Sequence, residues 1–421
     1  MTRKMKDSGV EWIGKIPEEW EIKRVSNYFY QLKNKNQGLV EKNLLSLSYG
    51  NIVRRNIDSS DGLLPVSFDS YNIVSEGDIV LRMTDLQNDH KSLRTGFVRE
   101  KGIITSAYIT LRQKTDNVSS RYISLVLSSF DFMKGFYGLG NGVRQNVNFG
   151  DIRKINIPFP SIEAQCKIVS RVEGEVKRID SIISETQQSI NELKKYKQAL
   201  ITETVTKGLN KNVEMKDSGI EWIKKVPKSW EIKKTRFFLK EVSEKNYPNE
   251  EILSLYRDYG VIPKNSRDDN HNVTSLDTSG YKLVNHNQLV INKMKAWQGS
   301  MAISEIRGII SPAYYVYEVL DKQIYIKFLH YALRNNAYLD EYRRISAGLR
   351  IGQWDLNKDL FKNVKIAFPS TMDEQRQIVD FLEEKIKWID NIVIEKEHLL
   401  IQFEQLKQSL IYEYVTGKKE A

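Results

Sequence analysis

The sequence predicts an α+β fold in which two tandem copies of a mixed α/β domain are separated by a long antiparallel two-helix coiled coil. The first observation is an internal repeat, because residues 5–13 (MKDSGVEWI) return as residues 215–223 (MKDSGIEWI), 210 positions later. The second is that each copy begins with short apolar runs and ends in a heptad pattern. A repeat this long exceeds the periods of solenoids and propellers, so each copy can hold its own core.

Basic residues are unevenly distributed along the chain. The formal net charge is +10, and 28% of residues are charged. Residues 163–208 contain eight Lys and Arg against seven Asp and Glu, and residues 370–421 contain seven against eleven. The basic excess therefore lies in the rest of each copy, as expected of a nucleic-acid-binding protein. A Lys-rich surface that only confers solubility is the alternative interpretation.

The chain contains a single cysteine, Cys166, so no disulfide can form within it. Its first residues are polar and lack the apolar core of a signal peptide. No stretch reaches the roughly 18 consecutive apolar residues of a membrane-spanning helix. These features together favour a reducing, cytoplasmic location.

Each copy opens with a front part whose short apolar runs, broken by Gly and Asn, are typical of strands. Apolar residues also recur at helical spacing in residues 122–132 and 325–335, so we expect one helix in each front part. Each front part is therefore predicted to be an α+β domain of roughly 150 residues. The predicted strands lie at residues 44–47, 79–81, 103–104 and 155–157, and at 252–255, 289–291, 309–310 and 364–366.

Beyond Pro160 and Pro369 the pattern changes to two long helices with a heptad repeat, each with a lysine at the same off-pattern place. The apolar stripe that a heptad repeat forms, called here a seam, needs a partner helix. The simplest partner is the equivalent helix of the other copy. We expect the antiparallel pairing, which sends the two front parts to opposite ends of a rod of about 60 Å. The two seams are Val172, Val176, Ile179, Ile183, Thr186, Ile190, Leu193, Lys197 and Leu200, and Leu382, Ile386, Ile389, Val393, Lys396, Leu400, Phe403, Lys407 and Leu410.

An ordered set of short motifs is present in both copies. Residues 157–169 (IPFPSIEAQCKIV) and 366–379 (IAFPSTMDEQRQIV) are similar to the proline and Glu-Gln-x-x-Ile start of a conserved helix in the specificity subunits of type I restriction-modification systems. Other matching segments follow the strands and lie near the end of each front part. They are residues 293–299 (KMKAWQG), 308–314 (GIISPAY), 142–145 (GVRQ) and 348–353 (GLRIGQ).

The resemblance implies a DNA-reading subunit with no catalytic groups of its own. It implies two DNA adenine methyltransferase subunits as partners, together with restriction and translocase subunits in the full complex. Each front part would read one half of a bipartite duplex target, while the helices would set the gap and dock the methyltransferases. The implied divisions are a first target-recognition domain at 1–160, a central helix at 161–208, a linker at 209–214, a second target-recognition domain at 215–370 and a carboxyl-terminal helix at 371–421.

Base reading needs side chains with paired donors or acceptors on loops, chiefly Arg or Lys toward guanine and Asn or Gln toward adenine. Loops that follow the predicted strands hold a high density of such groups. For any single residue, a solvated position or a phosphate contact is an equally good interpretation. The candidates are Tyr49, Arg82, Thr84, Asp85, Gln87, Asn88, Lys91, Asn141, Arg144, Gln145, Arg257, Tyr259, Lys293, Lys295, Trp297, Gln298, Arg350 and Gln353.

Tryptophan recurs at fixed positions in both copies, at Trp12 and Trp20 and again at Trp222 and Trp230. Two domains that read different bases would not share their reading residues. We therefore interpret these tryptophans as packing residues that hold the start of each copy on its domain or on the neighbouring helix.

Catalytic motifs are not found in the sequence. It contains no Asn/Asp-Pro-Pro-aromatic motif for amino methylation and no phosphate-binding Gly-x-x-x-x-Gly-Lys-Ser/Thr loop, and its five histidines are scattered. We expect no cofactor and no metal. Two alternatives stay open, namely a non-catalytic coiled-coil scaffold that binds acidic proteins or RNA and a DNA-binding regulator without methyltransferase partners.

Overall fold

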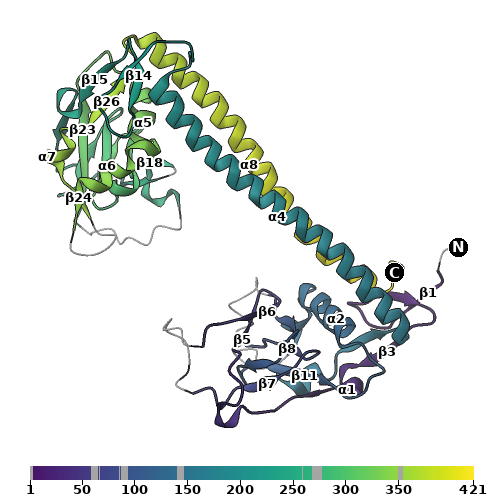
Figure 1. The fold of residues 1–421 in the computed structure, drawn as a ribbon. Coiled ribbons are helices and arrows are strands. Elements are labelled where there is room, and N and C mark those ends of the chain that lie inside the picture. Colours follow the sequence, from purple (N-terminus) through teal and green to yellow (C-terminus); the bar gives the residue numbers. More distant parts are fainter. Residues whose placement is uncertain are drawn as a thin grey trace. The chain divides into compact units, whose positions relative to one another are not determined.

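The computed structural model describes residues 3–57, 65, 67–84, 86, 93–139, 147–257, 259–267, 277–348 and 354–421. The chain forms two compact units, one of Met1–Gln187 with His398–Ala421 and the other of Gln188–Glu397. Each unit combines one front part, called here the first or second lobe, with the beginning of one long helix and the end of the other (Figure 1). The mixed α and β content and the two long helices confirm the predicted fold class.

The first lobe contains most of the predicted elements within one or two residues of their expected bounds. Its helix α2 (Ser120–Phe132) begins where the Ser119 hydroxyl accepts a hydrogen bond from the Tyr122 amide, as an N-cap does. The elements of this lobe are β1 (Met5–Asp7), β2 (Lys15–Pro17), β3 (Glu21–Arg24), α1 (Val25–Tyr28), β4 (Phe29–Gln31), η1 (Gln37–Leu39), β5 (Leu45–Ser48), β6 (Asn51–Arg54), β7 (Asn72–Val74), β8 (Ile79–Leu81), β9 (Thr95–Phe97), β10 (Gly102–Ile104), β11 (Ile109–Gln113), α2, η2 (Gly135–Gly138), α3 (Phe149–Ile152) and β12 (Asn156–Phe159).

The second lobe repeats this order, with the predicted helix present as α5 (Ile326–Arg334). Its elements are β13 (Met215–Asp217), β14 (Lys225–Pro227), β15 (Glu231–Lys234), η3 (Thr235–Phe237), β16 (Leu239–Val242), β17 (Leu253–Tyr256), β18 (Gly260–Pro263), η4 (Lys264–Ser266), β19 (Lys282–Val284), β20 (Leu289–Asn292), η5 (Ala296–Gln298), β21 (Met301–Ile303), β22 (Gly308–Ile310), β23 (Tyr314–Val319), α5, η6 (Asn336–Tyr338), α6 (Leu339–Arg344), β24 (Ser346–Ala347), β25 (Asp355–Leu356), α7 (Lys358–Phe361) and β26 (Lys365–Phe368).

The two lobes share one sheet topology. The central antiparallel sheet has the order β4-β11-β8-β9 in the first lobe and β16-β23-β20-β21 in the second. Around it lie the matching pairs β7 with β10 and β19 with β22, and the hairpins β5–β6 and β17–β18. The last strand of each lobe, β12 or β26, pairs with a strand near its start, β3 or β15. The sequence repeat is therefore a structural repeat.

The long helices are α4 (Ile162–Lys207) and α8 (Met372–Val415). Within each unit they lie side by side and antiparallel (Figure 1). The predicted seam residues are buried or half-buried throughout. The off-pattern lysines form equivalent ion pairs, Lys197 with Asp390 at 2.7 Å in one unit and Lys407 with Asp180 at 2.9 Å in the other. Both partners obey the shift of 210 residues, so the seam keeps the symmetry of the repeat.

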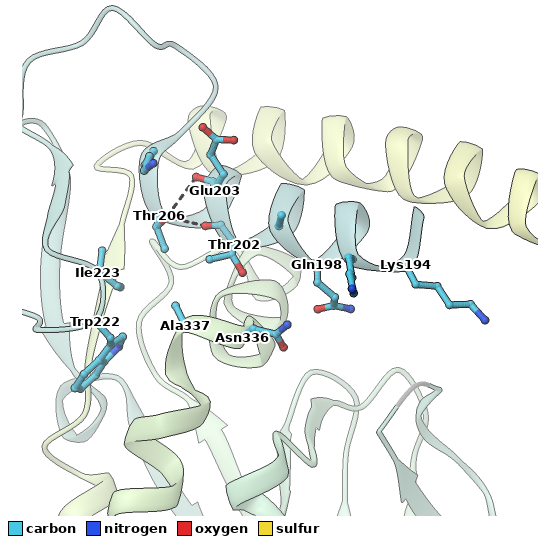
Figure 2. Close-up of a pocket in the computed structure, with 12 residues that line it drawn as sticks. Lys194, Gln198, Thr202, Glu203, Thr206, Trp222, Ile223, Asn336 and Ala337 are labelled. Carbon is cyan, nitrogen blue, oxygen red and sulfur yellow. Dashed lines mark hydrogen bonds between the residues drawn. The ribbon is translucent and has the colours of Figure 1, made fainter. Parts of the chain in front are cut away.

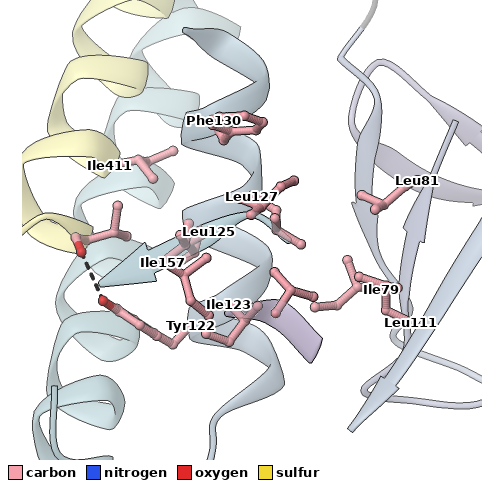
Figure 3. Packing of buried hydrophobic residues seen from close by; sticks show 14 of the residues in the cluster. Ile79, Leu81, Leu111, Tyr122, Ile123, Leu125, Leu127, Phe130, Ile157 and Ile411 are labelled. Atoms are coloured by element: carbon pink, nitrogen blue, oxygen red, sulfur yellow. Dashed lines mark hydrogen bonds between the residues drawn. The ribbon is translucent and has the colours of Figure 1, made fainter. Parts of the chain in front are cut away.

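The core of the first unit joins the first lobe to the end of α8. Tyr122 of α2 is fully buried, and its hydroxyl lies within hydrogen-bonding distance of the carbonyl oxygens of Val415, at 2.9 Å, and Pro158, at 3.1 Å. Figure 3 shows α2 between the sheet, represented by Ile79, and α8, represented by Ile411. The second unit has a matching core in which the second lobe packs on the end of α4.

The recurrent tryptophans pack as predicted. Trp20 and Trp230 are buried, whereas Trp12 and Trp222 are half-buried and make edge contacts with Phe130 and Tyr338 of their lobes. The glycine that follows each long helix has a positive φ, 73° at Gly208 and at Gly417. A Cβ atom at Gly417 would lie 3.1 Å from the Trp20 ring, and one at Gly208 would lie 3.4 Å from the Trp230 ring. Each helix end therefore rests on a tryptophan near the start of a lobe.

The glutamine of the motif that begins each long helix ties that helix to its lobe. The Gln165 side chain donates to the Pro160 carbonyl at 2.9 Å and accepts from the Ser119 amide at 2.9 Å. Gln375 repeats this arrangement, donating to the Pro369 carbonyl at 3.1 Å and accepting from the Tyr325 amide at 2.7 Å. Both glutamines are buried, so each satisfies backbone groups that water cannot reach.

Candidate nucleic-acid interface

The β5–β6 hairpin of the first lobe ends in a two-residue turn that exposes Tyr49. Both turn residues have a positive φ, 46° at Tyr49 and 79° at Gly50, and Ser48 pairs with Asn51 across the turn. Such turns match the twist of the flanking strands, although a tyrosine in this conformation is uncommon. The Tyr49 side chain is 72% exposed, so its aromatic face is available to a partner.

This hairpin packs on β9. A Cβ atom placed on Gly96 would lie only 2.5 Å from Cδ1 of Leu47 and 2.9 Å from Cδ1 of Ile52, so a larger residue would force these side chains to shift. A Cβ atom on Gly50 would lie 3.2 Å from the Cβ of Leu93. The structure therefore brings the Tyr49 turn next to the returning end of the segment that begins at Arg82.

Arg82 and Thr84 follow β8 at the end of the central sheet, and both side chains are half-buried. The Arg82 amide donates to the carbonyl of Arg94 at 2.9 Å, which extends the pairing of β8 and β9 by one residue. Met83, which lies between them, is buried in the core. The side chains at 82 and 84 are thus held away from the core side of the strand end.

Nine of the predicted reading residues lie outside the described residues. They are Asp85, Gln87, Asn88, Lys91, Asn141, Arg144, Gln145, Arg350 and Gln353.

The β17–β18 turn of the second lobe holds Arg257 and Tyr259 at positions equivalent to the Tyr49 turn. Both side chains are exposed, Tyr259 by 59%. The guanidinium of Arg267 lies 4.4 Å from the centre of the Tyr259 ring, a cation–π distance. From helix α5, the guanidinium of Arg334 donates to the carbonyl of Arg257, so the turn is tied to the body of the lobe.

The segment between β20 and β21 holds four of the predicted residues, and the structure gives them different surroundings. The Lys293 ammonium donates to the Pro312 carbonyl at 2.8 Å and lies 4.8 Å from the centre of the Tyr315 ring. The Trp297 indole donates to the Met294 carbonyl at 3.1 Å. Gln298 is half-buried, whereas Lys295 is exposed. Lys293 and Trp297 thus stabilise the backbone of this region through hydrogen bonds to carbonyls, and Lys295 is the more exposed of the two lysines.

Burial shifts the pKa values of several ionisable groups that lie near these segments. Burial, with a smaller contribution from the neighbouring Arg334 charge, lowers the pKa of His330 in α5 to about 3, so the ring is neutral near pH 7. Its Nε2 lies 2.7 Å from Arg334. Burial also lowers the pKa of Lys282, with a smaller contribution from the charge of Lys293. In the first lobe, burial raises the pKa of Asp131 to about 6 against opposing contributions from its partners.

Sequence reasoning did not identify Arg94, Arg334 or His330, which support the predicted segments from behind. Arg94 directly precedes a short apolar strand, and Arg334 and His330 lie on an amphipathic helix. From the local sequence alone, an arginine before a strand or on an amphipathic helix would be interpreted as exposed to solvent. Only the tertiary structure brings these groups under the turns.

A separate groove of about 820 Å³ lies in the second unit, away from these turns (Figure 2). It lies between the end of α4, including Thr202, and the segments that contain Trp222 and Ala337. In the first unit the position equivalent to Thr202 is Tyr412, whose hydroxyl lies within hydrogen-bonding distance of the carbonyl oxygens of Trp12, at 3.1 Å, and Ile13, at 3.3 Å. The groove therefore reflects a smaller side chain within a repeated framework.

The described residues contain no group of three or more His, Cys, Asp or Glu side chains placed to hold a metal ion. Within the same described ranges, every helix is too short or too polar to cross a lipid bilayer.

Comparison with known proteins gives consistent matches over both copies. The family model described as "Type I restriction modification DNA specificity domain" matches residues 17–195 and 227–401. The chain is 24% identical over 432 residues to the type I restriction enzyme MjaVIII specificity subunit of Methanocaldococcus jannaschii, and the match covers 96% of this chain and 94% of that protein.

Two solved structures share the fold. One is the HsdS subunit from Thermoanaerobacter tengcongensis, with a TM-score of 0.52 and 13% identity over 98% of this chain and 100% of that chain. The other comes from a study of complex assembly and conformational transition of the type I R-M system. Its TM-score is 0.65, with 13% identity over 96% of this chain and 99% of that chain.

Proposed function

The chain belongs to the family of type I restriction modification DNA specificity domains, and from this premise we propose that each lobe reads one half of a bipartite duplex DNA target. Family membership makes the chain a DNA sequence-recognition subunit without a catalytic role of its own. The observation that carries the division into half-sites is the repeated sheet topology, which presents different turn residues in each copy.

The two lobes differ where they would meet bases. The first lobe exposes Tyr49 at its hairpin turn, whereas the second exposes Arg257 and Tyr259 at the equivalent turn. Lys295 adds an exposed cation near β20 of the second lobe. Aromatic faces and cations can stack on bases or contact phosphates, and arginine can also pair with a guanine edge. Different side chains on one framework support two different half-sites.

We infer that the long helices set the gap between the half-sites. Helix α4 runs without interruption for 46 residues, about 70 Å at 1.5 Å per residue. The paired lysines Lys197 and Lys407 fix its register against α8 within each unit. A helix pair with a defined register is a suitable spacer, because adding or removing heptads changes its length in discrete steps.

We further propose that the partners are two DNA adenine methyltransferase subunits, docked on the helices, and restriction and translocase subunits in a full complex that acts in the cytoplasm. The curated relative is named as a subunit of a type I restriction enzyme, which supports a multi-subunit assembly for this chain. The numbers of each subunit rest on the resemblance in sequence motifs.

The experiment is a genome-wide map of N6-methyladenine in cells that express this chain with the methyltransferase encoded beside it. Cells that express the methyltransferase without this chain serve as the control. A split motif that appears only with the full chain supports the proposal. Methylation without a chain-dependent motif, from soluble protein with a bound methyltransferase, would instead favour a scaffold.

A further inference from the structure

We propose that Arg94 is a positioning residue for the segment that follows β8 in the first lobe, called here the reading segment. It fixes the start of that segment, residues 82–84, and thereby sets base preference in one half-site. This inference rests on the proposed function, because it concerns how that lobe holds its reading residues. Arg94 lies directly before β9 and is fully buried, which is rare for an arginine.

The guanidinium of Arg94 links the strand end to the wall of the lobe. Its Nη1 donates to the Thr84 carbonyl at 2.7 Å and to the Arg82 carbonyl at 3.2 Å. Its Nε donates to the Tyr137 hydroxyl at 3.2 Å, and the guanidinium carbon lies 5.4 Å from the centre of the Tyr137 ring. The Arg94 amide donates to the carboxylate of Asp131. One side chain thus joins the segment after β8 to η2.

Two apolar residues hold the same segment from the core side. Met83 is 2% exposed and Leu86 is fully buried, and both belong to the main core of the first unit. Their side chains and the carbonyls bound by Arg94 together restrain the backbone at residues 82–84 and at Leu86. Because side chains alternate along an extended segment, Arg82 and Thr84 are left facing away from that core.

In the second lobe a serine occupies the position equivalent to Arg94, and the neighbouring segment is held in another way. At the equivalent strand end the Asn292 amide donates to the Ser300 carbonyl at 3.0 Å, so Ser300 occupies the position of Arg94. There the shorter segment closes on itself, because the amides of Gln298 and Ser300 both donate to the Lys295 carbonyl. Backbone hydrogen bonds fix the segment of the second lobe, whereas in the first lobe a buried side chain binds the carbonyls of the residues directly after β8.

Burial of a charge argues that the role of Arg94 is geometric. Removing a guanidinium from water is costly, and its hydrogen bonds offset that cost without giving much net stability. The carbonyls of Arg82 and Thr84 would otherwise need other partners at a buried strand end. A substitution at Arg94 should therefore displace Arg82 and Thr84 and also lower the stability of the first unit, so the two effects are measured separately.

The test maps N6-methyladenine in cells that carry the neighbouring methyltransferase with wild-type chain, Arg94→Met or Arg94→Lys. Arg99→Met is the matched control, because Arg99 lies just after β9 and its side chain is 69% exposed. The readout, for each half-site separately, is methylation of the preferred sequence relative to its single-base variants. Thermal unfolding of each purified chain reports the effect on the fold.

We expect Arg94→Met to reduce the preference in one half-site by about tenfold, the scale of one lost base contact, with the other half-site unchanged. Arg94→Lys should lose less, since one ammonium can still reach one of the two carbonyls. Unchanged preference, or equal loss in both half-sites, overturns the inference. If Arg94→Met does not fold, Arg94→Lys decides by the same criterion. A wild-type chain that directs no split motif overturns the proposed function and this inference together.

Discussion

Substitution of Asp131 by Asn should remove an acid-dependent contribution to the stability of the first unit. Asp131 is almost fully buried in α2, facing the amides of Arg94 and Thr95 and the charges of Arg94 and Lys134. Burial raises its pKa from 3.8 to about 6, the opposing hydrogen bonds and charges being weaker. The folded protein therefore keeps a proton on this carboxyl at pH values where the unfolded chain has lost it.

The sign follows from this difference in bound protons. The stabilising contribution is fully present below pH 3.8 and is lost as the pH rises through 6, because ionisation then opposes burial. Between pH 4.5 and pH 7.5 the loss amounts to about 2 kcal/mol in the free energy of unfolding. An asparagine carries no proton to lose, so the corresponding change in the variant should be smaller by that amount.

The assay is urea unfolding of the full chain at pH 4.5 and pH 7.5, for wild type, Asp131→Asn and the exposed control Asp116→Asn. Only the change between the two pH values is compared, so any pH-independent cost of the new amide cancels. The control should follow the wild type. The reasoning is refuted if Asp131→Asn shows the same pH dependence as the wild type.

Two further substitutions test the repeated framework. Thr202→Tyr should occupy part of the groove of the second unit, with its hydroxyl near Trp222 as that of Tyr412 is near Trp12. Calorimetry should show a gain of about 1–2 kcal/mol from the added apolar burial. Thr202→Val is the control, and a lower melting temperature of Thr202→Tyr would contradict this prediction. Gln165→Leu should cost about 2–3 kcal/mol by orphaning buried backbone groups, and unchanged urea unfolding would contradict that role.

The seams, the strands and the packing role of Trp20 could be predicted because each leaves a local periodic or repeated signal. The heptad positions of α4 and α8 are buried or half-buried as expected. Which segments of the chain assemble into each unit could not be predicted in this way. That the end of α8 packs on α2, through Tyr122 and Val415, depends on residues 293 positions apart. Arg94 was missed for the same reason, because nothing in its local sequence shows that it is buried.

Whether two equivalent positions carry the same residue in both copies depends on what that residue contacts. Gln165 and Gln375 bind backbone at the start of a long helix, and they recur because both lobes need the same junction there. Arg94 and Ser300 occupy equivalent strand ends, yet they hold segments of different length. A lobe can therefore change its reading segment, together with the group behind it, while the junctions to the helices stay the same. Divergence at the strand ends with constancy at the junctions is what independent half-site recognition requires.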